Sequence, residues 1–291
     1  MSEHHIPVLL KEVLEYLDLQ PGDIVIDATF GFGGHSKEIL KEIATSGKLV
    51  AIEKDSEILE KAKDGFKDKR ITFINGDFRN IDSILEKLKV KKVSKILFDL
   101  GISSYHFDES ARGFTFQSDE PLDMRLDLGL AVKASDLVNG LSQRELADLF
   151  YRLADERYSR QVARAIYDYR RKKRIESTQE LAEIIAGSKP RFGKIHPATQ
   201  VFQALRIAVN NELEALSEAL PKAINLLEKN GRIVLISFHS GEDRIVKNIF
   251  KTCASQNIIE ILTKKPLTAS FAEKKSNPRS RSAKLRAAQR R

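Results

Sequence analysis

Four carboxylates stand at or just past the ends of short apolar runs, where a parallel sheet would bind a ligand. They are Asp27, Glu53, Asp77 and Asp99. In an open parallel sheet, ligands bind beyond the carboxyl ends of the strands, at the point where the strand order reverses. Aspartate favours turns for its own reasons, so a single acid at such a place would carry little weight. Four in succession predict a ligand-binding edge.

A glycine-rich turn, GFGGH at 31–35, follows the first of these runs. Glycine accepts positive φ and lets the backbone approach a ligand closely. Glu53 lies 22 residues after Gly31, the spacing at which an acid meets the diol of a ribose. Pyrophosphate recognition uses a third glycine at the sixth position of the motif, where this chain has Ser36. A cofactor with one ribose and no phosphate needs only the turn and the acid, which favours S-adenosylmethionine over NAD.

Two ring side chains beside these acids have two interpretations each. Phe78, next to Asp77, could stack on the adenine of a cofactor, but its spacing predicts an ordinary core position equally well. His35 could donate a hydrogen bond to a ligand carboxylate or merely occupy the start of a helix. Both alternatives stay open from the residues alone.

The elements that must position these residues are predicted from hydrophobic periodicity. In the first hundred residues, strands are expected at 23–27, 48–53, 71–74 and 95–99, with helices between them near 36–46, 55–66 and 79–90. After residue 205, a helix is expected near 211–229, followed by a strand at 231–237 and a weaker one at 257–262. Strands that alternate with helices indicate βαβ units and a mostly parallel sheet.

The alternation stops between about 105 and 205, where the pattern is helical. Ser142 and Glu145 have the spacing of a capping box, a helix is expected over 157–174, and Ser177 begins another. We therefore predict one α/β domain formed by 1–105 and 206–291, with an inserted helical domain at 106–205.

The composition narrows the class of protein. The net charge of +8 favours a polyanionic partner, although dispersed lysine and glutamate on solvated faces would also produce it. Basic side chains gather in 157–174 and again in 277–291, which has six of them and no acid. Cys253 is the only cysteine, which excludes an intramolecular disulfide, and we find no apolar run near the roughly 20 residues that a membrane span needs. We expect a cytoplasmic protein.

Nine short segments follow one another along the chain: HIPVLL at 5–10, DATFGFGGHS at 27–36, DLGISS at 99–104, RGFTF at 112–116, PLDMR at 121–125, HPAT at 196–199, FQALR at 202–206, ISFHS at 236–240 and NPRSRS at 277–282. In these segments the chain resembles the bacterial ribosomal RNA small subunit methyltransferase H family over essentially its whole length. One such match would be weak evidence, but their number and order make the resemblance specific. The chain departs from the family at Gly241, where leucine is usual, and at His106, where many relatives have glutamine.

The resemblance implies a Rossmann-like class I methyltransferase domain that transfers a methyl group from S-adenosylmethionine to N4 of a cytidine in the decoding region of 16S rRNA. The partner would be 16S rRNA or the small ribosomal subunit; no metal is implied, and a homodimer is left open. The cofactor contacts that the resemblance implies are Gly33, Gly34, His35, Glu53, Phe78, Asp99 and His106.

The residues nearest the reaction are expected at the end of the fourth strand. Asp99 and Ser103 are the candidates for accepting hydrogen bonds from the cytosine amino group. His239 is a second catalytic candidate, although a histidine that caps the next turn would have the same spacing. In the insert, Phe114, Phe116 and Asp123 are expected nearest to the cytosine pocket, and the basic stretches are expected to contact RNA phosphates.

Two other classes remain open. An NAD-dependent oxidoreductase would also use Gly31 and Glu53, but the missing third glycine opposes it. A basic RNA-binding assembly factor could keep the same sequence with a vestigial cofactor site.

Overall fold

The computed structural model describes residues 7–191, 193 and 196–291, and in it the chain divides into two compact units. The first unit comprises the described residues of 1–102 together with 213–291, and the second those of 103–212. The second unit is therefore longer at both ends than the predicted insert at 106–205. His5 and Ile6, with which the first matching segment begins, lie outside the described residues.

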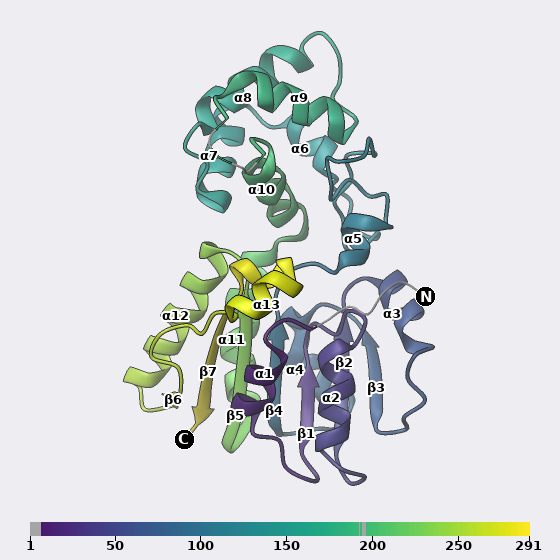
Figure 1. The fold of residues 1–291 in the computed structure, drawn as a ribbon, viewed down its shortest axis with the longest axis vertical. Helices are drawn as coiled ribbons and strands as arrows, with labels where there is room; N and C mark the ends of the chain where they lie inside the picture. Colours follow the sequence, from purple (N-terminus) through teal and green to yellow (C-terminus); the bar gives the residue numbers. More distant parts are fainter. Residues whose placement is uncertain (1–6, 192, 194–195) are drawn as a thin grey trace. The chain divides into compact units, whose positions relative to one another are not determined.

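The first unit is built around a sheet with the strand order β3-β2-β1-β4-β5-β7-β6 (Figure 1). Its elements are α1 Leu10–Leu17, β1 Ile24–Asp27, α2 Gly34–Glu42, β2 Lys48–Glu53, α3 Ser56–Lys63, β3 Ile71–Asn75, η1 Phe78–Asn80, α4 Ile81–Lys87, β4 Val93–Asp99, α11 Glu212–Leu226, β5 Leu227–Ser237, α12 Ser240–Ser255, β6 Ile259–Ile261, α13 Phe271–Ser276, η2 Pro278–Ser282 and β7 Lys284–Arg290. Strands β1 to β5 pair in parallel, and β7 pairs antiparallel with β5 and β6. The predicted α/β fold with a mostly parallel sheet is confirmed.

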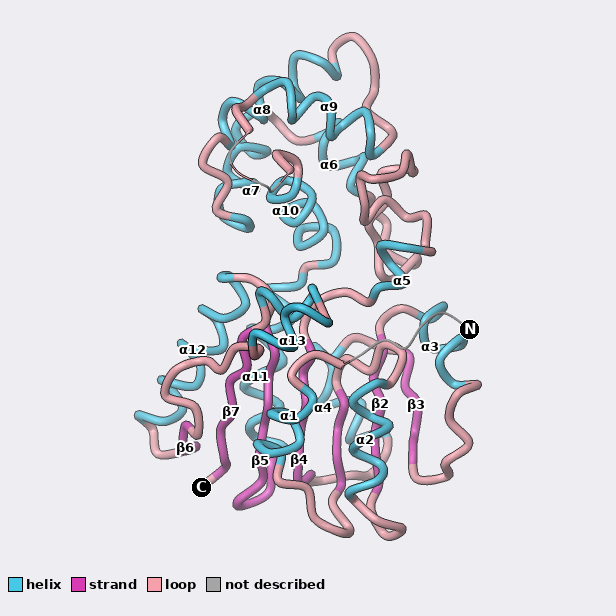
Figure 2. Tube along the Cα trace, in the orientation of Figure 1, coloured by secondary structure: helices cyan, strands magenta, loops and turns pink. Residues whose placement is uncertain are grey.

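Helices cover both faces of this sheet (Figure 2). On one face, α1 and α2 contribute Val13 and Ile39 to a buried cluster with strand residues, and on the other, α11 and α12 contribute Leu220 and Phe250. Parallel strands that are covered on both faces read as continuous apolar runs. This is why β4, which is buried in all but its last residue, could be located from the sequence.

The register of the sheet brings the ends of its central strands together. Asp27, the last residue of β1, pairs with Ala51 on β2 and with Leu97 on β4. Strands β2 and β3 lie on one side of β1, and β4 and β5 lie on the other. The strand order therefore reverses between β1 and β4, which is where sheets of this kind bind their ligands.

The basic segment at the end of the sequence is a strand and not an exposed arm. Leu285, Ala287 and Ala288 of β7 are buried, and Arg286 is only 7% exposed. Its guanidinium Nε lies 2.6 Å from Asp243 Oδ1 on α12. The expectation that Arg286 belongs to an RNA surface is wrong, because this residue is buried and paired where the sheet joins β5 to β6. The side chain of Lys284 is 37% exposed, so the expectation for that residue stays a prediction.

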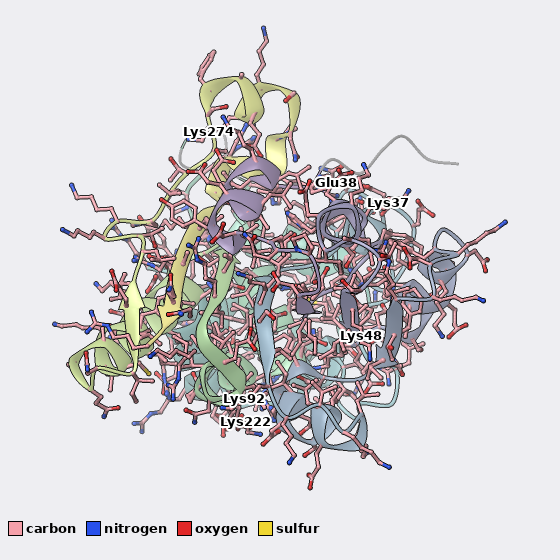
Figure 3. The ribbon with its side chains drawn as sticks, turned by 90° about the horizontal axis from the view of Figure 1, so that it is seen from below. Lys37, Glu38, Lys48, Lys92, Lys222 and Lys274 are labelled. Atoms are coloured by element: carbon pink, nitrogen blue, oxygen red, sulfur yellow. The ribbon has the colours of Figure 1, made fainter. Side chains whose placement is uncertain are left out.

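Part of the positive charge of the first unit is ordinary solvated surface. Lys37, Lys48 and Lys92 are exposed (Figure 3). Lys41 lies 2.8 Å from Glu38 one turn away on the same helix. Exposed pairs of this kind contribute little to stability. The net charge is therefore no evidence by itself for a nucleic-acid site on this unit.

The second unit is helical. Its elements are α5 Ser104–Asp108, α6 Ala134–Gly140, α7 Gln143–Ala154, α8 Ser159–Arg170, α9 Thr178–Ser188 and α10 Thr199–Asn210. The predicted capping box is present at the start of α7, where Ser142 N donates to Glu145 Oε2 at 2.7 Å and Glu145 N donates to Ser142 Oγ at 3.2 Å. Ser177 caps α9 in the same way, through Glu180 N.

Among the residues that the structure describes, no helix combines the length and the apolar character that crossing a membrane requires.

Candidate active site

The glycine turn lies between β1 and α2, and two of its glycines have backbone conformations that side chains disfavour. Gly31 has φ 56° and Gly33 has φ 72°. A Cβ on Gly33 would lie 2.3 Å from the ring of Phe66 and 2.6 Å from that of Phe30. Gly33 is also the residue that precedes the first turn of α2, where helical N–H groups have no partner within the helix. The turn therefore presents bare backbone at the carboxyl end of β1.

Glu53 holds this turn against β2. Its Oε2 accepts a hydrogen bond from Gly31 N at 2.8 Å, and its Oε1 accepts one from Asp55 N at 2.8 Å. Burial raises the pKa of Glu53 to about 7, against the lowering effect of these two hydrogen bonds. The carboxylate keeps further lone pairs for a ligand hydroxyl, because each oxygen can accept more than one hydrogen bond.

Asp27 and Thr29, at the end of β1, form hydrogen bonds with residues of α2 and of β4. Asp27 is 2% exposed and accepts from Ser36 Oγ at 2.7 Å and from Thr29 N at 3.3 Å. Burial raises the pKa of Asp27 to about 6. Thr29 Oγ1 in turn accepts from Asp99 N at 2.6 Å. Sequence reasoning singled out Asp27 and Asp99 but missed Thr29 and Ser36, whose only signal was their position within the segment 27–36.

His35 and Asp99 face each other at the switch point between β1 and β4. His35 Nδ1 lies 3.6 Å from Asp99 Oδ2, and His35 Nε2 lies 3.0 Å from the carbonyl oxygen of Val8. The imidazole is only 6% exposed. Both ring nitrogens thus face protein atoms. The carbonyl oxygen of Val8 takes the place beside Nε2 where a ligand carboxylate could otherwise bind.

Asp99 is a third acid at this edge with a raised pKa. Burial raises its pKa well above the usual value, and Asp27 and Glu242 add to this effect through charge repulsion. Its Oδ1 is buried, and within the described part of the chain it has no hydrogen-bond partner. A buried hydrogen-bond acceptor without a partner destabilises the folded protein. A ligand that donates a hydrogen bond to Oδ1 would remove this cost and bind more tightly.

Asp77 and Phe78 lie at the carboxyl end of β3. Asp77 Oδ1 accepts from Arg79 N at 2.9 Å and so caps η1, and Asp77 Oδ2 lies 2.9 Å from Lys54 Nζ. Phe78 is half-buried and packs edge to face against Phe98, with ring centroids 5.5 Å apart. The ring thus has a core contact on one side and remains partly accessible, which is compatible with both interpretations made from the sequence.

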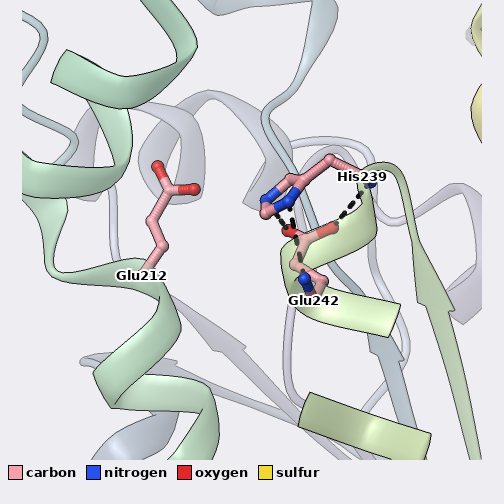
Figure 4. Close-up of side chains that lie close together, drawn as sticks. All are labelled: Glu212, His239 and Glu242. Atoms are coloured by element: carbon pink, nitrogen blue, oxygen red, sulfur yellow. Dashed lines mark hydrogen bonds and ion pairs between the residues drawn. The ribbon is translucent and has the colours of Figure 1, made fainter. Parts of the chain in front are cut away.

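His239 caps α12 (Figure 4). Its Nδ1 accepts from Gly241 N at 3.2 Å and from Glu242 N at 3.4 Å. In return, Glu242 Oε2 accepts from His239 N at 3.3 Å, which Figure 4 shows, and from Phe238 N at 2.8 Å. A Cβ on Gly241 would lie 3.1 Å from the His239 ring, so the departure from leucine at this position relieves a tight contact. These reciprocal hydrogen bonds favour the structural interpretation of His239 over the catalytic one.

Ser103 and His106 belong to the second unit and are brought together at the start of α5. Ser103 Oγ accepts from Tyr105 N at 3.3 Å, and Ser103 N donates to His106 Nδ1 at 3.1 Å. His106 is buried, with its ring centroid 4.9 Å from that of Phe114. Both side chains therefore have structural partners in addition to the roles expected for them.

Phe114, Phe116 and Asp123 each have structural partners within the second unit. Phe116 stacks on His196, with centroids 4.7 Å apart, while Phe114 packs against His106. Both carboxylate oxygens of Asp123 are bound by Arg125, at 2.7 and 2.9 Å. Arg125 therefore already satisfies the carboxylate that was expected near a cytosine.

The fold and the edge of the first unit together define a class. A parallel sheet with a bare glycine turn after β1, an acid at the end of β2 and no third glycine is typical of α/β enzymes that hold a nucleoside cofactor without a phosphate.

Comparison with known proteins then identifies the family. The model of the MraW methylase family matches residues 2–291. Proteins named ribosomal RNA small subunit methyltransferase H are 48% identical in Sulfurihydrogenibium sp. (strain YO3AOP1) over 295 residues and in Persephonella marina over 296, with 100% of each chain covered. One from Clostridium botulinum (strain Loch Maree / Type A3) is 43% identical over 304 residues and 98% of both chains. A solved rRNA methylase from Streptococcus thermophilus aligns over 99% of both chains, with 11% identity and a TM-score of 0.48.

The chain belongs to the MraW methylase family. It is an S-adenosylmethionine-dependent methyltransferase, and the resemblance stated from the sequence motifs is confirmed.

Proposed function

We propose that this chain transfers a methyl group from S-adenosylmethionine to N4 of a cytidine in the decoding region of 16S rRNA, in the cytoplasm. Full-length relatives at 43–48% identity are named ribosomal RNA small subunit methyltransferase H, which supports rRNA as the substrate. The observation that carries the proposal is the buried Oδ1 of Asp99 at the end of β4, beside the glycine turn. This oxygen has no hydrogen-bond partner among the residues that the structure describes.

The residues of the first unit fit S-adenosylmethionine. The turn keeps its shape only with glycine at position 33, where a Cβ would collide with Phe66 and Phe30, and Glu53 can accept a hydrogen bond from a ribose hydroxyl. Phe78 offers a partly accessible ring to adenine. When bound there, S-adenosylmethionine supplies an electrophilic methyl group activated by a positively charged sulfur.

Asp99 is proposed to act on the substrate amino group. The lone pair of the cytosine amino nitrogen is delocalised into the ring, which makes the nitrogen a poor nucleophile. An acceptor that draws the N–H bonds out of the ring plane localises that lone pair. Asp99 Oδ1 is such an acceptor, and the Ser103 hydroxyl, whose oxygen already accepts from Tyr105 N, is the second candidate.

Positioning provides most of the rate in this scheme. Holding the nitrogen in line with the methyl carbon converts a bimolecular step into an intramolecular one. A strong base is unnecessary, since the methylated amino group loses its proton readily. The segment DLGI at 99–102 lacks the consecutive prolines of amino-directed DNA methyltransferases. The catalytic role of Asp99 is therefore proposed from its surroundings in this protein and not from that motif.

The second unit is proposed to recognise RNA. Four exposed arginines at helical spacing form what we call the basic ridge: Arg157, Arg160, Arg164 and Arg171. Arg164 lies 3.6 Å from Asp168, while neighbouring Lys173 and Arg174 pair with Glu180 and Asp136. Phosphate contacts from the ridge would position the RNA without reading its sequence. The target base must be unpaired or leave its stack to react.

Transfer of tritium from labelled S-adenosylmethionine to 30S particles, followed by mass-spectrometric mapping of 16S rRNA, tests the proposal. We expect one labelled nucleotide, an N4-methylated cytidine, whose labelling falls to a small residual rate with Asp99→Asn at saturating S-adenosylmethionine. Label on another atom or nucleotide would overturn the proposed target. Binding of NADH instead of S-adenosylmethionine would favour an oxidoreductase, and RNA binding without transfer would favour an assembly factor.

Replacing 103–212 by a short linker tests the role of the second unit. We expect the remaining chain to bind S-adenosylmethionine more weakly, since His106 is removed, and to methylate no rRNA even at saturating cofactor, because the contacts with the substrate are lost. Unchanged methylation would contradict the role proposed for the second unit.

A further inference from the structure

The imidazole of His35 can exchange a proton at only one of its nitrogens. Its Nε2 lies 3.0 Å from the carbonyl oxygen of Val8, which accepts hydrogen bonds and cannot donate them. Nε2 therefore carries a hydrogen in every protonation state of the ring. The remaining nitrogen, Nδ1, faces Asp99 Oδ2 at 3.6 Å. Any proton that the ring gains or loses is thus gained or lost beside Asp99.

The surroundings of Asp99 oppose its ionisation. Asp27 at the end of β1 and Glu242 on α12 are buried acids whose charges act on it, and burial removes the water that would solvate its own charge. Within the described residues, the ion-pair contact of Asp99 is with His35 on α2, and no lysine or arginine pairs with it. His35 is therefore the group that can compensate a negative charge on Asp99.

We propose that His35 is a positioning residue that keeps Asp99 ionised for the reaction, by holding on Nδ1 the proton that the Asp99 carboxyl gives up. The proton moves from the carboxyl oxygen to Nδ1, leaving a carboxylate beside an imidazolium, and the pair has no net charge before or after. Asp99 Oδ1 is then a full carboxylate acceptor for an amino N–H. The proposal rests on the proposed methyl transfer to a cytosine amino group.

The place of His35 in the chain supports this assignment. The residue directly follows Gly34 in the turn, and Asp99 N is itself bound by Thr29 at 2.6 Å, so both partners are fixed by the same edge of the sheet. The separation of 3.6 Å is longer than a hydrogen bond. Catalytic hydrogen bonds are often long before the ligand binds and shorten in the complex.

His35→Gln separates the two functions of the ring. The glutamine side chain can still donate an amide N–H to the Val8 carbonyl, but it cannot take up a proton. We expect the acidic limb of the pH–rate profile for transfer to 30S particles to move upward by about one pH unit or more, which is about a tenfold loss of rate at pH 6. The rates are taken at saturating S-adenosylmethionine at every pH, so that changes in cofactor affinity caused by His35→Gln or by titration of Glu53 do not enter the profile. A profile that coincides with that of the wild-type enzyme would overturn the proposal.

A double-variant cycle and a direct titration complete the test. With Asp99→Asn in place, His35→Gln should cause no further change in the pH profile, because the coupled carboxyl is gone. In protein with ¹³C-labelled aspartate, with Asp99 assigned through its loss in Asp99→Asn, His35→Gln should raise the pKa of the Asp99 carboxyl. An additive cycle or an unchanged titration would contradict the pairing. The titration needs no RNA, so a wild-type enzyme that labels no rRNA would refute the proposed function without deciding the His35–Asp99 pairing.

Discussion

At the scale of single residues, the ionisation of Glu53 should make the affinity for the cofactor depend on pH. Its pKa is raised by burial to about 7, so it is ionised above that pH and protonated below it. A protonated carboxyl has lost acceptor capacity toward a ribose hydroxyl. We therefore expect S-adenosylmethionine to bind about tenfold more weakly at pH 6 than at pH 8, measured by calorimetry.

Glu53→Gln is the control for this pH dependence. The amide does not titrate, so most of the difference in affinity between pH 6 and pH 8 should disappear, together with some affinity at pH 8. Asp27, whose pKa is raised to about 6, and Asp99, whose pKa is also raised, are the other acids at this edge. If Glu53→Gln kept the whole pH dependence, one of these two acids would be the group that titrates and the prediction would be wrong.

Gly33 gives a second prediction at this scale. In Gly33→Ala the new Cβ would lie 2.3 Å from the Phe66 ring, at a φ of 72° that alanine disfavours. We expect a loss of about 1–3 kcal/mol in the free energy of unfolding and a marked loss of S-adenosylmethionine affinity.

Gly187→Ala is the matched control, because a Cβ there meets nothing within 4 Å and the residue lies in α9. Alanine should leave cofactor affinity unchanged and stabilise the helix by up to about 1 kcal/mol. Equal effects of the two substitutions, in thermal unfolding and in calorimetry, would mean that the turn does not need its glycine.

At the scale of elements, substitutions of His239 at the start of α12 can distinguish a helix-capping role from a catalytic one. His239→Ala removes the acceptor for two backbone N–H groups and should cost about 1–2 kcal/mol in urea unfolding. His239→Asn places a carbonyl oxygen near the same donors and should keep both stability and methyl transfer close to wild type. Loss of transfer in a stably folded His239→Asn variant would restore the catalytic interpretation.

Strand β7 gives a prediction about charge inside the sheet. Arg286→Ala leaves Asp243 buried beside an empty space, because Arg286 Nε was 2.6 Å from its carboxylate. Lys284 Nζ, at 3.7 Å from Asp243, would compensate only in part. We expect a loss of about 3 kcal/mol in the free energy of unfolding, whereas Arg281→Ala, which removes an exposed arginine from η2, should change it by less than about 0.5 kcal/mol. Similar losses for the two variants would contradict a structural role for Arg286.

The same elements show how far the sequence could predict the structure. Strands β1, β2 and β4 were located because burial on both faces makes them continuous apolar runs. Strand β3 lies at the edge of the sheet and is only partly buried, but its short apolar run at 71–74 was enough to predict it. Strand β7 was missed because Arg286 interrupts its apolar pattern, and only the partner Asp243 makes that arginine compatible with burial. At the site, the glycine turn and the acids were visible as local spacing. The contacts of His35 with Val8 and of Thr29 with Asp99 join segments far apart in the chain, so no local pattern could reveal them.

At the scale of the whole molecule, the basic ridge should make RNA binding depend on salt. Each phosphate contact that is lost should lower the slope of log affinity against log salt by about 0.7–0.9. Replacing Arg157, Arg160 and Arg171 by glutamine should therefore weaken binding of 16S rRNA and flatten that slope, without changing S-adenosylmethionine affinity. Filter binding at several salt concentrations measures both. Exchanging exposed Lys37, Lys48 and Lys92 of the first unit for glutamine is the control, and an equal effect there would mean that the ridge has no special role.

The position of β7 also bears on how the nascent chain acquires its shape. Strand β6 is made before β7, yet its partner in the sheet is β7, with Ile259 opposite Arg290 and Ile261 opposite Ala288. While the ribosome is still adding residues 262–283, β6 therefore has no strand to pair with, and the edge of β5 is open to any other extended segment. A stalled translation product that ends in this interval should be captured by chaperones or proteases, whereas one extended past Arg290 should escape them.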